Sequence, residues 1–262
     1  MIAAIVLTNF GLSAALFAAL CLVSVRIRDP SFIDAWWGLG VIALACATFL
    51  QTPSRGAHAL ALMLLATAWG LRLGLYLLGR WRAHGKDRRY EGLEAQAAKA
   101  GLSFAAFSAL WVFAPQMLLQ FVVALPAMLG QLTDKTMFGA AAWLGLALSA
   151  FGIVYEAIAD WQLARFKADP TNAGKVMDKG LWRYSRHPNY FGDMCAWWGM
   201  WLIAADAGFA WQSLAGPLLL TFLLTRVSGA PTTEPHLKRT KPEYQAYEAR
   251  TSAFVPWRPA SR

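Results

Sequence analysis

Long apolar runs separated by polar connections dominate the chain. A helix that spans a bilayer needs about 20 mostly apolar residues, and seven segments meet or approach that length. They cover residues 3–25, 32–51, 57–79, 104–129, 137–160, 189–205 and 209–228. The pattern predicts an all-α integral membrane protein built as a bundle of seven transmembrane helices. Because no polar stretch is long enough to fold alone, we expect residues 1–262 to form a single domain.

The cations are distributed unevenly between the two sides of this predicted bundle. The connections after the first, third and fifth segments, together with the C-terminal tail, carry 20 of the 24 Lys and Arg residues. The opposite connections contain only Arg55 and Lys135. Cytoplasmic loops of membrane proteins are enriched in Lys and Arg, so we expect the N-terminus outside and the C-terminus in the cytoplasm. The net charge of +9 then needs no nucleic acid to explain it.

The remaining composition narrows the class of protein. The compact, alanine-rich chain favours a bacterial inner membrane, with membrane lipids as its surroundings and no obligate protein partner. The three cysteines lie in apolar segments without CxxC spacing, and the four histidines lack the spacing of metal ligands. We therefore expect no metal site. His58 is interpreted as an exposed residue at the end of a span.

A dense polar and aromatic block, LWRYSRHPNYFGD at residues 181–193, runs directly into an apolar segment. Pro188 predicts the first turn of a helix at this point, where free N–H groups can hold an anion. The wider stretch 161–193 interleaves six cations with aromatic rings. Arginine suits phosphate recognition, so this stretch predicts a site for a nucleotide cofactor.

Ionisable residues also occur inside the predicted spans, where an unpaired charge is costly. Arg72 and Tyr76 are four residues apart, as are Glu156 and Asp160, so each pair shares a helix face. One interpretation is purely structural, with Asp34 neutralised by Arg72 and Asp160 by Arg165. The other is functional, because all these groups approach the same end of the bundle.

The block GLWRYSRHPNYFGD, followed by a tryptophan-rich span, resembles the steroid 5α-reductase-like membrane family, particularly its bacterial branch. The resemblance runs from FIDAWWGLG to EYQAYEARTSAFVPW. It implies a seven-helix fold that uses NADPH from the cytoplasmic side to reduce the Δ4 double bond of 3-keto steroids. The substrate would be an apolar steroid or related enone that enters from the lipid.

The resemblance also implies the site residues. NADPH would be held by Arg88, Arg89, Glu156, Asp160, Arg165, Lys167, Tyr184, Arg186, His187, Asn189, Asp193, Glu234 and Tyr244. The chain lacks the Gln-Glu pair of vertebrate members, and Asp34 is the nearest acidic counterpart. We expect Asp34, kept protonated by apolar burial, to polarise the substrate carbonyl with Tyr76 or Tyr90. The substrate would contact Trp36, Trp37 and Trp69.

Two other function classes remain open at this stage. Isoprenylcysteine carboxyl methyltransferases and phospholipid N-methyltransferases have a similar Arg-His-Pro-x-Tyr turn beside a membrane helix and use S-adenosylmethionine. Glu234 followed by Tyr244 also suits these methyltransferases. They have fewer spans, however, and their cofactor needs fewer phosphate-binding cations. A non-enzymatic lipid-binding bundle would instead tolerate loss of Asn189 and Asp193.

Overall fold

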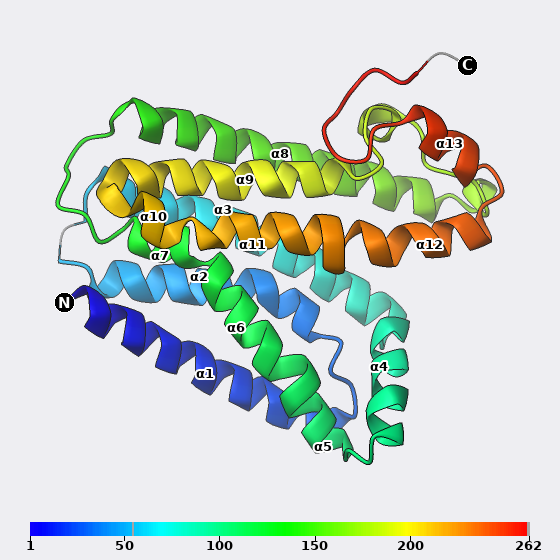
Figure 1. Cartoon of the computed structure of the whole chain (residues 1–262), viewed down its shortest axis with the longest axis horizontal. Coiled ribbons are helices and arrows are strands. Elements are labelled where there is room, and N and C mark those ends of the chain that lie inside the picture. The colour runs from blue at the N-terminus through cyan, green and yellow to red at the C-terminus, as the bar shows by residue number, and fades with distance from the viewer. Residues whose placement is uncertain (54, 261–262) are drawn as a thin grey trace.

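The computed structural model describes residues 1–53 and 55–260, which form helices joined by loops and contain no β-strand. Four helices are longest: α1 (Ile2–Ile27), α2 (Ile33–Gln51), α3 (Ala57–His84) and α8 (Ala140–Ala168). Figure 1 shows α3, α8 and α9 (Pro188–Ala204) running along the long axis of the molecule, with α1 and α2 below them. The predicted all-α class is confirmed.

Shorter elements complete the bundle. Between α3 and α8 lie α4 (Arg88–Lys99), α5 (Phe104–Phe107), the π-helix η1 (Ser108–Phe113), α6 (Ala114–Val123) and α7 (Leu125–Leu129). The 3-10 turns η2 (Pro170–Asn172) and η3 (Gly180–Arg183) precede α9. After α9 come η4 (Ala205–Phe209), α10 (Ala210–Ser213), α11 (Ala215–Phe222), η5 (Leu223–Val227), α12 (Ala230–Thr240) and α13 (Tyr244–Arg250).

Within the part of the chain that the structure describes, five helical segments are long and apolar enough to cross a membrane: α1, α2, α3, Phe104–Val123 and α8. A sixth arises if the pair Pro188–Ser213 and Ala215–Thr240, bent by 77°, counts as one broken span. These segments fit a multi-pass integral membrane protein. The chain reverses near Gly208, whose φ of 101° lies in a region that favours glycine, and α9 and α11 then lie side by side (Figure 1).

Glycine allows α2 and α3 to approach closely. A Cβ added to Gly38 would collide with the backbone carbonyl of Gly70, and one added to Gly70 would collide with that of Gly38. Gly145 of α8 meets the backbone of Gly199 on α9 in the same way. Small residues at helix contacts are typical of membrane bundles, because backbone packing replaces the hydrophobic driving force there.

The two ends of the bundle differ. Figure 1 shows α4, α12 and α13 gathered at one end, with the N-terminus at the other. At the N-terminal end His58 is fully buried and its Nε2 lies 2.7 Å from Oδ2 of Asp206. The interpretation of His58 as an exposed residue is therefore wrong, because the loop before α8 and the turn after α9 close over it; Phe138 packs edge-on against its ring.

Candidate functional site

A cavity of about 590 Å³ lies at the α4 and α12 end of the bundle. Its wall combines side chains from α2, α3, α4 and α6 with others from α8, α9, η5, α12 and α13. The volume falls within the roughly 300–1,000 Å³ typical of ligand sites. Most of the residues predicted to bind cofactor or substrate, or to act in catalysis, line it: Asp34, Trp37, Trp69, Tyr76, Arg89, Tyr90, Glu156, Asp160, Lys167, Arg186, His187, Asn189, Asp193 and Tyr244.

Five predicted residues do not line this cavity. Arg88, Arg165 and Tyr184 are exposed on the surface, and Arg165 stacks over the ring of Trp161. The fourth, Trp36, is partly buried. The fifth, Glu234, lies behind the cavity wall, where it contacts two residues that do line it.

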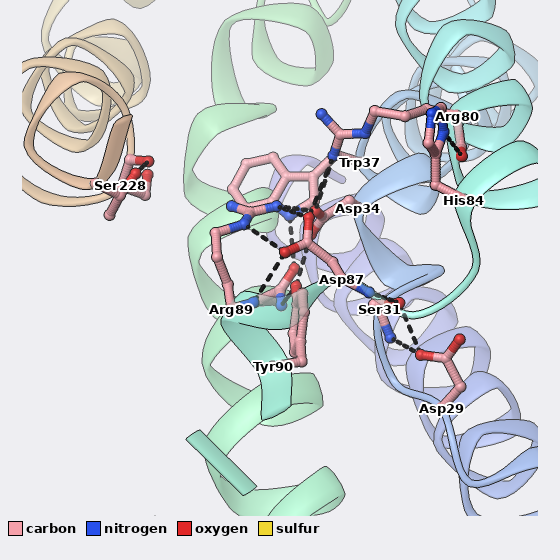
Figure 2. Close-up of polar contacts among 12 residues, drawn as sticks. Asp29, Ser31, Asp34, Trp37, Arg80, His84, Asp87, Arg89, Tyr90 and Ser228 are labelled. Carbon is pink, nitrogen blue, oxygen red and sulfur yellow. Dashed lines mark hydrogen bonds and ion pairs between the residues drawn. The ribbon is translucent and has the colours of Figure 1, made fainter. Parts of the chain in front are cut away.

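Asp34, at the start of α2, is held by two residues of α4. Its Oδ1 accepts a hydrogen bond of 2.6 Å from the Tyr90 hydroxyl, and its Oδ2 one of 2.7 Å from Arg89 (Figure 2). Arg80 approaches to 3.8 Å. The expected partnership of Asp34 with Arg72 is therefore wrong. The expected apolar burial is also wrong, since the Asp34 side chain is partly exposed and is surrounded by polar groups of Arg80, Arg89 and Tyr90.

Asp87 places α4 against this cluster. It caps α4 by accepting from the backbone N–H of Arg89 at 2.9 Å, and it also holds the Arg89 side chain (Figure 2). Burial opposes ionisation of Asp87, but the hydrogen bonds from Arg89 outweigh it and hold the pKa of this carboxyl below its usual value. Burial, and then the charge of Asp34, raise the pKa of Tyr90 well above that of a free tyrosine. Tyr90 is therefore a neutral hydrogen-bond donor.

Arg72 neutralises acids of α8 from its position on α3. It pairs with Glu156, and its Nη1 lies 2.8 Å from Oδ2 of Asp160. The other oxygen of Asp160 accepts from the Asn189 amide at 3.1 Å. The expected pairing of Asp160 with Arg165 is wrong. Arg165 lies on the exposed face of α8, away from the bundle. Three helices thus meet at one buried ionic cluster.

Trp69 and Asp193 face each other deeper in the cavity. The indole N–H of Trp69 donates to Oδ1 of Asp193 over 2.9 Å, and both side chains are buried. Trp197 packs edge-on against Trp69 with ring centroids 5.0 Å apart. The acid of α9 is therefore held by a residue expected only to contact substrate.

The polar block folds as the sequence predicts at Pro188, which is the first residue of α9, with His187 at the N-cap. His187 Nε2 and Arg186 Nε both lie 2.9 Å from Oε1 of Glu234 on α12. The imidazole of His187 is stacked between the rings of Tyr190 and Phe254. Glu234 therefore orients two residues of the cavity wall.

The C-terminal tail returns over the block. Arg186 donates to the carbonyl of Thr251 at 2.8 Å, and Ser185 Oγ donates to that of Phe254 at 2.7 Å. The Tyr247 hydroxyl reaches the carbonyl of Trp182. Burial raises the pKa of Tyr247, so its hydroxyl stays protonated. The tail thereby forms part of the wall at the α4 and α12 end of the bundle.

Several cavity groups could hold a nucleotide cofactor. Asn189 Oδ1, Glu156 Oε2 and the Tyr244 hydroxyl are buried without a hydrogen-bond partner in the part of the chain that the structure describes. Within those same residues, Lys167 and Lys241 line the cavity and have no carboxylate within 4.0 Å. Lys241 donates to the backbone carbonyl of Lys175. Lysines that lack a carboxylate partner suit phosphates, while carboxylate and amide oxygens suit ribose hydroxyls or a carboxamide. The donor set therefore fits NADPH.

Sequence reasoning missed one central residue of the wall. Gln116 on α6 donates to the Tyr90 hydroxyl at 3.1 Å and accepts from the Trp37 indole at 2.8 Å. An amide inside an otherwise apolar span was the available signal. Its neighbour Gln120 gives the same signal but bonds to the backbone carbonyls of α2, so the signal alone does not distinguish an amide that lines the cavity from one that packs helices.

The sequence is similar to an uncharacterized protein of Schizosaccharomyces pombe, with 26% identity over an alignment of 266 residues. The alignment covers 89% of this chain and 74% of that protein. No solved structure matches the chain. Residues 20–251, which include every element that lines the cavity, match the family described as "Protein of unknown function (DUF1295)". The chain therefore belongs to the DUF1295 family.

Proposed function

We propose that this protein is an NADPH-dependent reductase of the Δ4 double bond in 3-keto steroids or related apolar enones. One observation carries the proposal: a single cavity contains both the Asp34 and Tyr90 pair and two lysines, Lys167 and Lys241, that have no carboxylate partner among the described residues. Charge is therefore supplied where a phosphate would bind, and a neutral hydroxyl where a carbonyl would bind. A reductase needs both groups in one cavity, so that the bound cofactor and the bound substrate lie next to each other.

The cofactor would lie against α8, α9 and the tail. Lys167 and Lys241 would bind phosphates, and Asn189 and Glu156 would accept hydrogen bonds from the carboxamide or ribose. His187 and Arg186, held by Glu234, would shape the wall beside them. Buried carboxylates are also compatible with the amino acid part of S-adenosylmethionine, so methyltransferase chemistry is the second candidate.

Tyr90 would act on the substrate. Bound NADPH would supply a hydride to the β-carbon of the enone. Negative charge then develops on the carbonyl oxygen, and Tyr90 would donate its proton there, giving an enol that tautomerises to the saturated ketone. Tyr90 would regain a proton from solvent at the mouth of the cavity. Asp34 and Arg89 would keep the phenol in place rather than serve as the acid.

The membrane arrangement belongs to the same proposal. We place α9 and the α10–η5 segment as separate spans, so that the single domain of residues 1–262 crosses seven times in a bacterial inner membrane. The N-terminus would face outside and the cavity the cytoplasm. The cation-rich connections at the α4 and α12 end support this orientation.

Detergent-purified protein tests the activity directly. We expect oxidation of NADPH that depends on a Δ4-3-keto steroid and yields a saturated A ring. Tyr90→Phe should lower kcat by about 100-fold and leave NADPH affinity unchanged. The double variant Lys167→Met/Lys241→Met should weaken NADPH binding instead.

Lys238→Met is the matched control. Lys238 lies on α12, which also contributes to the cavity wall, but its Nζ pairs with Glu248 at 2.8 Å. It should bind NADPH like the wild type. Binding of S-adenosylmethionine without any binding of NADPH would contradict the reductase and favour the methyltransferase.

A further inference from the structure

A directed chain of hydrogen bonds runs along the wall of the cavity. The Trp37 indole N–H donates to Gln116 Oε1 at 2.8 Å, and Gln116 Nε2 donates to the Tyr90 hydroxyl at 3.1 Å. Tyr90 in turn donates to Asp34 Oδ1 at 2.6 Å. All four side chains line the cavity. They come from α2, α4 and α6, so the chain ties three helices together.

Chemistry fixes the direction of this chain at both ends. An indole nitrogen can only donate, so the Gln116 atom that faces Trp37 is the carbonyl oxygen. The amide NH₂ then faces Tyr90, whose oxygen must accept from it. The single Tyr90 proton is left to point at Oδ1 of Asp34, to which the hydroxyl donates.

We propose that Gln116 is a positioning residue, which holds the Tyr90 oxygen while its proton turns from Asp34 to the carbonyl oxygen of the substrate. This inference rests on the proposed reductase function. The phenol loses its bond to Asp34 when the proton turns, and Gln116 then supplies the remaining side-chain hydrogen bond to its oxygen. That bond also stabilises the charge that grows on the oxygen as the proton leaves.

The geometry separates this role from simple helix packing. A packing amide needs only a partner, whereas the proposed role requires that Gln116 donate to Tyr90. Glutamate at this position has nearly the same shape and can still accept from Trp37. When ionised it cannot donate to Tyr90, and it would compete with the substrate for the tyrosine proton. When protonated it can donate again.

Two variants and one control test the role in full-length protein in detergent. Gln116→Leu should lower kcat by about tenfold with unchanged NADPH affinity at every pH. Gln116→Glu should be equally slow at pH 8 and should recover kcat as the pH falls and the glutamate takes up a proton. Gln120→Leu, one turn along α6, removes an amide that bonds only to backbone carbonyls; it should lower thermal stability but not the kcat of the folded protein.

The outcomes separate the two proposals. A wild-type protein with no enone-dependent NADPH oxidation overturns both the reductase function and the role of Gln116. An active wild type whose kcat is unchanged by Gln116→Leu overturns the role of Gln116 alone. So does a Gln116→Glu variant that shows no recovery at low pH relative to Gln116→Leu, because helix packing alone predicts that result.

Discussion

Trp69 on α3 donates its indole N–H to the carboxylate of Asp193 on α9, over 2.9 Å and away from solvent. The bond joins the N-terminal half of the chain to the polar block that begins α9. Because a buried acid without a donor is costly, this bond supports the shape of the cavity floor. Trp69 therefore has a structural role in addition to the substrate contact expected of it.

Replacing Trp69 by Phe should remove the donor and leave the Asp193 carboxylate buried. We expect a loss of about 1–3 kcal/mol in stability, seen as a lower melting temperature in detergent. The matched control is Trp198→Phe, which removes an indole bond to the Thr221 hydroxyl that also bonds to the backbone. An equal loss in both variants would contradict a special role for the Trp69 bond.

Replacing Arg72 should lower the stability of the protein far more than replacing Arg165. Arg72→Met leaves Glu156 and Asp160 without their cation, and breaking a buried ion pair from one side costs about 3–5 kcal/mol. Thermal unfolding measures the loss. Adding Glu156→Gln and Asp160→Asn should restore much of it.

Arg165→Met serves as the comparison for this series. Arg165 is exposed on α8, so its replacement should change stability by no more than about 0.5 kcal/mol. If Arg165→Met were as damaging as Arg72→Met, the assignment of Arg72 as the partner of both acids would be wrong.

Gly38→Ala should weaken the contact between α2 and α3. The added methyl group meets the backbone of Gly70, and such overpacking costs about 1–3 kcal/mol. Gly11→Ala on α1, where nothing lies within 4 Å of the added atom, should be neutral or stabilising because alanine favours helix. The measurement is again the melting temperature of each purified variant.

Labelling in intact cells tests the proposed topology. In a background without native cysteines, Asp134→Cys should react with a membrane-impermeant maleimide, while Ala173→Cys and Glu243→Cys should react only after lysis. If α9 and α11 formed one bent span, Glu243→Cys would be labelled from outside. That result would leave six spans and place α12 and α13 on the other side of the membrane from α4.

The sequence predicted those features that depend on one helix at a time. The apolar runs predicted the helices, although α3 and α8 continue past their predicted ends to His84 and Ala168. Polar residues can continue a helix beyond its apolar part, so the end of an apolar run does not mark the end of the helix. Pro188 predicted the start of α9 because proline suits the first turn. The spacing of Glu156 and Asp160 placed both acids on one face.

Which side chains meet depends on how distant helices pack against one another. Helical spacing tells which residues share a face but not which helix lies opposite, so Arg72 could not be assigned to α8 rather than to Asp34. For the same reason the contact of Gln116 could not be predicted, because it depends on α4 placing Tyr90 against α6. His58 looked like a terminal residue until the turn that carries Asp206 covered it. The pattern of apolar and charged residues predicts a helical membrane chain with a cation-rich end, whereas the candidate site forms only where distant helices pack together.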